Sequence, residues 1–211
     1  MDALFTPEEL NARERVRAYF RGGRGGGADG GESAFDALRV LKDLGLGARS
    51  GAGFSGLPGL VGAALVVDEF SRVSPRLGLA LLAGWGPPGP ASGPEHAAAT
   101  TAWDLGTTSA AYDACLEAAR GRGFFGSTLM GHQRVQMDLA GILAGLEAAR
   151  LQAYRAMRLI DRGRRDRGGE ELERARQLAG RTCEAAKALA ATLLGQDRVQ
   201  EIFPERERSR P

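Results

Sequence analysis

The chain has 211 residues, 43% of them hydrophobic, which is enough to bury a core in one or two domains. Its formal net charge of +2 is too small and too evenly spread to favour nucleic acid or an anionic membrane as a partner. Cys115 and Cys183 are the only cysteines, so the chain is no disulfide-rich scaffold, and we interpret both as reduced packing residues.

The first half of the sequence predicts three helices. The first begins at Thr6, a typical N-cap residue followed by Pro, and ends near Gly22. The second covers about residues 33–44 and the third about residues 60–82, each with apolar residues at helical spacing. Pro75 should kink or split the third helix. Its adjacent acids, 68 and 69, point to different sides and are interpreted as an ordinary surface pair.

A spacer rich in Gly and Pro follows, and it predicts the main boundary of the chain. Thr107, Thr108 and Ser109 are candidate caps for the next helix, which should run to about Arg120. Long amphipathic patterns over residues 131–162 and 170–194, joined by a polar connector, then predict an antiparallel helical hairpin.

The fold class that these patterns predict is all-α, because no run typical of a β-strand is present. We expect an N-terminal helical domain over residues 1–83, a linker over 84–105, a helical bundle over 106–203 and a polar tail over 204–211. Residues 1–10 lack the features of a secretory signal, and charges interrupt the longest apolar stretch. We therefore expect a cytoplasmic protein that does not enter a membrane.

The sequence contains few residues that could bind a metal ion or form a catalytic triad. His96 and His132 are the only histidines, and no cysteine or carboxylate group has ligand spacing. Residues 51–56 match the dinucleotide pattern G-x-G-x-x-G, but no strand precedes them and Pro58 follows, so we interpret them as a loop.

Residues 122–136 carry the most information. They contain Arg122, then Phe125 followed by Gly, a leucine, and the pair His132-Gln133. This order resembles the flavin-binding motif of the acyl-CoA dehydrogenases, R-x-x-F-G-x-x-L followed by an aromatic residue or His and then Gln. Residues 5–9 and 65–79 are similar to the first helical domain of that family, and residues 139–154 and 183–188 to its third domain. We name residues 122–136 the FAD clasp.

The resemblance implies roles for individual residues. In the family, the clasp contacts the FAD of a neighbouring protomer, so Arg122 would bind the pyrophosphate with its planar charged fork. Phe125 would pack beside the dinucleotide, His132 occupies the aromatic-or-His position, and Gln133 would hydrogen-bond to the cofactor. Gln200 lies near the position of a later flavin-contacting Gln. The alternative is that the apolar clasp positions are only core residues and that Arg122 faces water.

The sequence departs from the family pattern in its middle. A β-domain that binds the isoalloxazine and the acyl thioester is expected between the helical domains, but the spacer from residue 84 to 94 stands there. The loop that carries the catalytic Glu in most members has no counterpart. Some members place this base before the clasp, and Glu95 lies one residue from that position, which makes it a weak candidate. No other catalytic residue is predicted.

The resemblance therefore favours an accessory, non-catalytic subunit that contributes its clasp to the FAD site of a partner. Apolar faces left without the β-domain predict a homo-oligomer, or a hetero-oligomer with a full-length acyl-CoA dehydrogenase. Two alternatives remain. One is an FAD-dependent dehydrogenase or a repurposed acyl-thioester enzyme that acts alone, and the other is a nonfunctional remnant.

Overall fold

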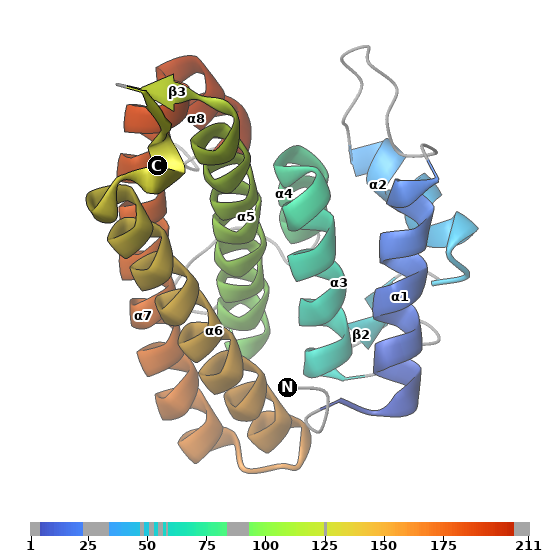
Figure 1. Ribbon diagram of the computed structural model, residues 1–211. Helices are drawn as coiled ribbons and strands as arrows, with labels where there is room; N and C mark the ends of the chain where they lie inside the picture. The colour runs from blue at the N-terminus through green and yellow to red at the C-terminus, as the bar shows by residue number, and fades with distance from the viewer. Residues whose placement is uncertain are drawn as a thin grey trace, which may run out of the picture.

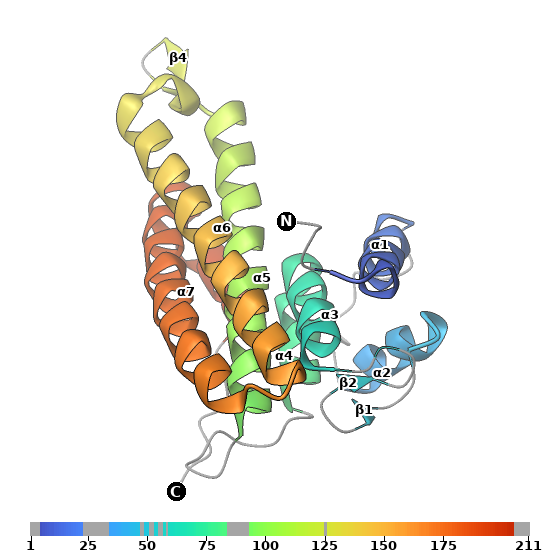
Figure 2. The same cartoon turned by 90° about the horizontal axis from the view of Figure 1, so that it is seen from below.

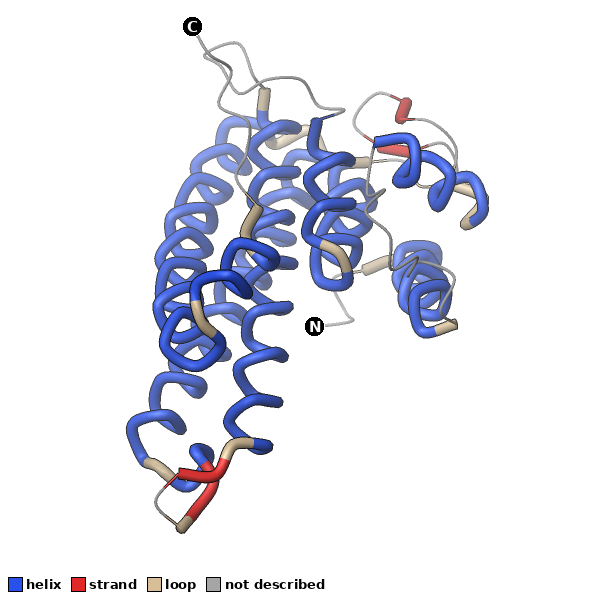
Figure 3. The backbone as a smooth tube through the Cα atoms, turned by 90° about the horizontal axis from the view of Figure 1, so that it is seen from above, coloured by secondary structure: helices blue, strands red, loops and turns tan. Residues whose placement is uncertain are grey.

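The computed structural model describes residues 5–22, 34–46, 49–50, 53–54, 57, 59–83, 93–124 and 126–204. The helices are α1 (Pro7–Arg21), α2 (Ala34–Asp43), α3 (Leu60–Val73), α4 (Pro75–Ala83), α5 (Pro94–Gly121), α6 (Gln133–Asp161), α7 (Arg165–Leu194) and α8 (Gln196–Ile202), with a 3-10 turn η2 (Leu129–Gly131). Two antiparallel pairs of two-residue strands complete the described chain: β1 (Arg49–Ser50) with β2 (Gly53–Phe54), and β3 (Gly123–Phe124) with β4 (Ser127–Thr128). The predicted all-α class is confirmed, since the strands are confined to these two small pairs (Figure 3).

Local signals set several helix ends where the sequence predicts them. The side chains of Thr6 and Glu9 form a capping box at the start of α1, each accepting a hydrogen bond from the backbone N–H of the other, at 3.3 and 2.8 Å. Pro75 splits the predicted third helix into α3 and α4, as expected for a residue that cannot donate a backbone hydrogen bond. Helices α6 and α7 form the predicted antiparallel hairpin (Figure 1).

The predicted linker over residues 84–105 is too long, because α5 already begins at Pro94. Proline is favoured at the first helical position, and the alanine-rich residues that follow are strong helix formers. The predicted caps lie inside this helix: the hydroxyls of Thr107, Thr108 and Ser109 donate to carbonyls one turn earlier, at 2.6 to 2.9 Å. These hydroxyls are buried and satisfied within the helix. The predicted connector is also too long, since α7 begins at Arg165.

Helix α3 lies at the centre of the molecule. Every residue from Leu60 to Ser71 is buried, because α1, α4, α5 and α6 surround the helix. Figure 2 shows it between α1 and α2 on one side and α5 and α6 on the other. One continuous apolar cluster includes residues of α1 to α7, so the two halves of the chain share a core. Among the described residues, no helix has the length and apolar character required to cross a bilayer.

The acids 68 and 69 are not a surface pair, contrary to the prediction. Asp68 accepts hydrogen bonds from Arg150 through both carboxylate oxygens, each at 3.1 Å, and from the Tyr154 hydroxyl at 3.0 Å. Glu69 is bound in the same bidentate way by Arg17, at 2.9 and 2.6 Å. Adjacent residues do point to different sides of α3, but both sides are covered. The acids therefore connect α3 to α6 and to α1.

A second polar contact joins the end of α6 to the start of α3. The backbone N–H groups of Leu60 and Val61 donate to the two carboxylate oxygens of Asp161, at 2.8 and 3.1 Å. Gly59 precedes this helix with a φ of 95° and has no side chain to cap it. A side chain from a distant segment therefore performs the task that an N-cap residue usually performs.

Replacing Asp161 by alanine should lower the free energy of unfolding by about 1 kcal/mol, because two N–H groups lose their acceptor. Urea denaturation of the variant and the parent protein measures this difference. Asp166→Ala is the matched control, since Asp166 is an exposed acid in the first turn of α7. Equal losses in the two variants would contradict the capping role of Asp161.

Candidate functional site

Four of the predicted cofactor-binding residues belong to segments at one end of the helical bundle, where α5 ends, α6 begins and α8 lies; we name this end the clasp end (Figure 1). Arg122 follows the last residue of α5, and His132 and Gln133 begin α6. Gln200 lies on α8, which follows α7 and packs against α5 and α7. The fifth predicted residue, Phe125, lies outside the described residues.

Arg122 is exposed, but its side chain is fixed at one point. Its Nη1 atom donates a hydrogen bond of 2.6 Å to the backbone carbonyl of Leu193, near the end of α7. Its own carbonyl accepts from the N–H of Leu129 at 2.9 Å, next to the strand pair of β3 and β4. Gly126 provides the turn between these strands with a φ of 80°. A guanidinium has five N–H donors, so the Leu193 carbonyl uses only a fraction of its binding capacity.

The start of α6 presents polar groups beside the same end. Gln133 is exposed as the first residue of the helix, and His132 is half-buried at the N-cap position. Gln136 is turned back, since its Nε2 atom donates to the Met130 carbonyl at 2.8 Å. Gln200 is exposed on α8. Amide and guanidinium groups at one exposed end can bind phosphate and carbonyl oxygens of a ligand that covers this end.

The apolar clasp positions have a different role. Leu129 and Val135 are partly buried and pack against a second apolar cluster, which contains Cys115, Leu139 and Ile202 among others. The leucine and valine serve the core, while Arg122 and Gln133 face solvent.

Glu95 lies at the opposite end of α5 from Arg122. At a rise of about 1.5 Å per residue, the two Cα atoms are about 40 Å apart along the helix. The Glu95 carboxylate is 3.8 Å from the guanidinium of Arg165, at the start of α7. The structure therefore does not bring this candidate base together with the clasp residues of the same chain.

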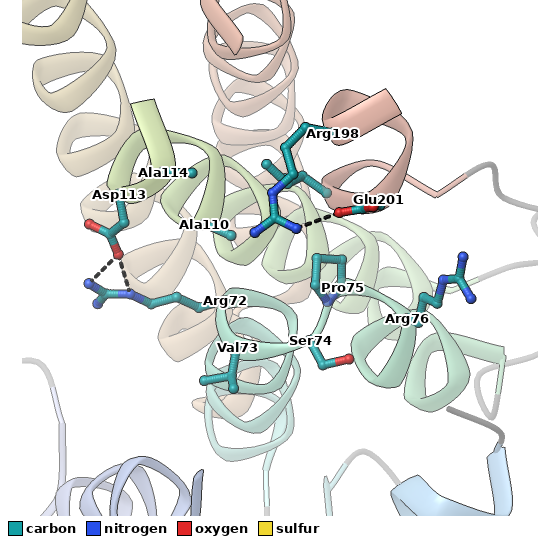
Figure 4. A pocket seen from close by; sticks show the side chains of 11 residues that line it. Arg72, Val73, Ser74, Pro75, Arg76, Ala110, Asp113, Ala114, Arg198 and Glu201 are labelled. Carbon is teal, nitrogen blue, oxygen red and sulfur yellow. Dashed lines mark hydrogen bonds and ion pairs between the residues drawn. The ribbon is translucent and has the colours of Figure 1, made fainter. Parts of the chain in front are cut away.

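A cavity of about 500 Å³ opens where the junction of α3 and α4 meets α5 and α8 (Figure 4). Its charged lining comes from four helices and contains two ion pairs, Arg72 with Asp113 at 2.8 Å and Arg198 with Glu201. Arg76 is a further lining residue. No sequence motif indicated this cavity, because its residues come from distant segments. It contains none of the clasp residues.

The cysteines fit the packing role that the sequence predicts. Cys115 and Cys183 are buried, and burial raises the pKa of each thiol to about 11. The thiolate form is therefore scarce at neutral pH. Within the part of the chain that the structure describes, no three His, Cys, Asp or Glu side chains gather as a metal site would require.

The comparisons with known proteins identify a family for the C-terminal half of the chain. The family model described as "Acyl-CoA dehydrogenase, C-terminal domain" matches residues 95–203. That range extends from the first turn of α5 to the residue after α8, and it includes every residue of the clasp end. No curated protein and no solved structure matches the chain.

Proposed function

This chain belongs to the acyl-CoA dehydrogenase family, and we propose that it is an accessory subunit that completes the FAD site of a partner dehydrogenase. The observation that carries the proposal is the distribution of polar groups along α5. Arg122 and Gln133 are exposed at the clasp end, whereas the one candidate base, Glu95, lies about 40 Å away. The described residues of the chain thus offer one side of a cofactor site, and a partner would supply the other side together with a catalytic base.

The residues at the clasp end fit an extended, anionic cofactor. The Leu193 carbonyl holds Arg122 in one position, so less side-chain freedom would be lost on binding a pyrophosphate. Gln133 and Gln200 are exposed and could hydrogen-bond to the nucleotide. In the family, FAD accepts a hydride from the β-carbon of the acyl thioester. Binding and orienting this cofactor is the task we assign to the present residues.

The segment between the helical halves argues against independent catalysis. Only residues 84–93 separate the end of α4 from the start of α5. A domain that holds an isoalloxazine and an acyl thioester in line needs far more chain. A complete dehydrogenase chain would supply this domain together with its own catalytic base.

Coexpression with a full-length acyl-CoA dehydrogenase tests the proposal. The complex should be purified through a tag on the present chain, and bound flavin quantified by its visible absorbance. Arg122→Ala should weaken flavin binding about ten- to a hundredfold, because a hydrogen bond to a charged group contributes about 1.5–3 kcal/mol. Arg120→Ala removes the same charge from the exposed last turn of α5 and serves as the control.

Two outcomes of this experiment distinguish the alternatives, and a further variant separates binding from folding. Flavin that is retained equally by the Arg122→Ala and Arg120→Ala complexes would exclude the clasp role. Flavin bound by the purified chain without a partner would favour the enzyme that acts alone. Gln133→Ala separates binding from folding, since this exposed side chain can be removed without changing the core; it should lower flavin affinity while the melting temperature stays unchanged.

A further inference from the structure

The cavity of about 500 Å³ lies beside the break between α3 and α4, and none of the clasp residues lines it. Ser74, between the two helices, has the extended backbone angles φ −138° and ψ 102°, so the chain changes direction there. Helices α5 and α8 contribute the other lining residues (Figure 4). Cavities of roughly 300–1,000 Å³ accommodate small ligands. We name this one the α8 cavity.

One part of the lining is apolar and open to solvent. Val73 is 49% exposed, although it is a large hydrophobic residue at the end of a helix that is otherwise mostly buried. Pro75, Ala110, Ala114 and Ile202 complete this apolar part of the cavity. An exposed apolar surface inside a concave site favours a ligand that has an apolar body of its own.

The other part of the lining is charged, with an excess of cations. Its arginines are Arg72, Arg76 and Arg198, and its acids are Asp113 and Glu201. Each acid is already paired with one guanidinium, Asp113 with Arg72 and Glu201 with Arg198. Arg76 has no ion-pair or hydrogen-bond partner among the residues that the structure describes. The lining therefore has one positive charge in excess, which favours an anionic ligand.

Arg198 is the residue best placed to bind this anion. Figure 4 shows it extending from α8 into the space between α5 and the junction of α3 and α4. Its Nη1 atom donates to Glu201, but a guanidinium has five N–H donors, so several remain for a ligand. The planar guanidinium matches the planar carboxylate group, to which it can donate two parallel hydrogen bonds.

We propose that the α8 cavity binds a small organic carboxylate, whose charged group pairs with Arg198 and whose apolar body contacts Val73 and Pro75. Inorganic anions lack the apolar body and neutral apolar molecules lack the charge, so neither matches both parts of the lining. This inference does not depend on the accessory role, because the cavity contains no clasp residue and the test uses the chain without a partner.

Titration of the purified chain with benzoate tests the proposal, with benzamide as the uncharged counterpart. Isothermal titration calorimetry should show saturable benzoate binding with a Kd of about 1 mM or lower, a strength that a ligand of this size can reach. Benzamide has the same shape without the charge and should bind at least about tenfold more weakly. Inorganic phosphate has charge without an apolar body, so it should also bind more weakly than benzoate.

Substitutions in the cavity should change benzoate binding in both directions. Arg198→Ala should raise the Kd about ten- to a hundredfold, because a hydrogen bond to a charged group is lost. Val73→Glu places a carboxylate in the cavity and should raise the Kd as well. Glu201→Gln should lower it, since the acid that competes for Arg198 is removed. Arg15→Ala is the matched control, because Arg15 is an exposed arginine that lines a different cavity, next to α1.

Three results would overturn the proposal. The first is a parent chain that binds neither benzoate nor hexanoate, whose apolar body is aliphatic, in a saturable way. The second is benzoate binding no tighter than that of benzamide or phosphate. The third is an equal Kd for benzoate in Arg198→Ala, Arg15→Ala and the parent. Circular dichroism of each variant verifies that the helices are intact, which is expected because all substituted side chains are exposed.

Discussion

Replacing Arg150 by alanine should lower the free energy of unfolding by about 3–5 kcal/mol, because it leaves the buried carboxylate of Asp68 without its cation. Asp68 is only 5% exposed, and Arg150 binds both of its oxygens as well as the Ser109 hydroxyl at 2.7 Å. Burial by itself lowers the pKa of a guanidinium, but the neighbouring Asp68 carboxylate outweighs this effect and raises the pKa of Arg150. The Arg150 guanidinium is therefore charged at neutral pH.

Urea denaturation measures this loss, and the chain contains a closely matched control. Arg72 binds Asp113 at 2.8 Å, again across two helices, but both side chains are largely exposed. Arg72→Ala should therefore change the free energy of unfolding by no more than about 1 kcal/mol. The double variant Asp68→Asn, Arg150→Ala should be less destabilised than Arg150→Ala alone, since it removes the unpaired charge. Similar losses for Arg150→Ala and Arg72→Ala would show that burial of the pair is unimportant.

The close contact of α3 with α5 predicts a second large effect, at Gly106. A Cβ atom at this position would lie 2.3 Å from the carbonyl oxygen of Asp68 and 2.6 Å from the Cβ atom of Ser71. Neither atom can move unless α3 moves as well. Gly106→Ala should therefore lower the free energy of unfolding by about 1–3 kcal/mol, although alanine is the better helix former.

Gly180→Ala should change the free energy of unfolding in the opposite direction, although Gly180 also lies inside a long helix. Gly180 lies inside α7, and a methyl group added there would meet no atom of another helix within 4 Å. This substitution should raise the free energy of unfolding by about 0.5–1 kcal/mol through helix propensity. Thermal or urea melts of the two variants therefore shift in opposite directions. A stabilised Gly106→Ala variant would mean that α3 and α5 are further apart than the structure places them.

The sequence predicted those features that depend on neighbouring residues. The capping box at Thr6, the break at Pro75 and the α6–α7 hairpin all follow from local patterns, and the structure contains each of them. Arg122 and Gln133 flank one short connection, because only a strand pair and η2 separate α5 from α6. In these cases the types of neighbouring residues in the sequence are sufficient to predict the structure.

Features that depend on tertiary packing were not predictable in this way. The acids of α3 look like a solvated pair in the sequence, and only the surrounding helices make them buried partners of Arg150 and Arg17. Thr107 to Ser109 have the residue types of caps, yet burial inside α5 directs their hydroxyls to the preceding turn. The contact of Arg122 with the Leu193 carbonyl joins segments far apart in the chain, so no spacing could reveal it.

The burial of α3 has a consequence for how this protein can change over generations. A surface helix can vary freely on its outer side, but α3 has no outer side from Leu60 to Ser71. Each position there must suit neighbours from several helices at once, and two of them must also keep a charge matched to an arginine elsewhere. Mutational drift should therefore spare this segment and accumulate along the charged outer side of α7.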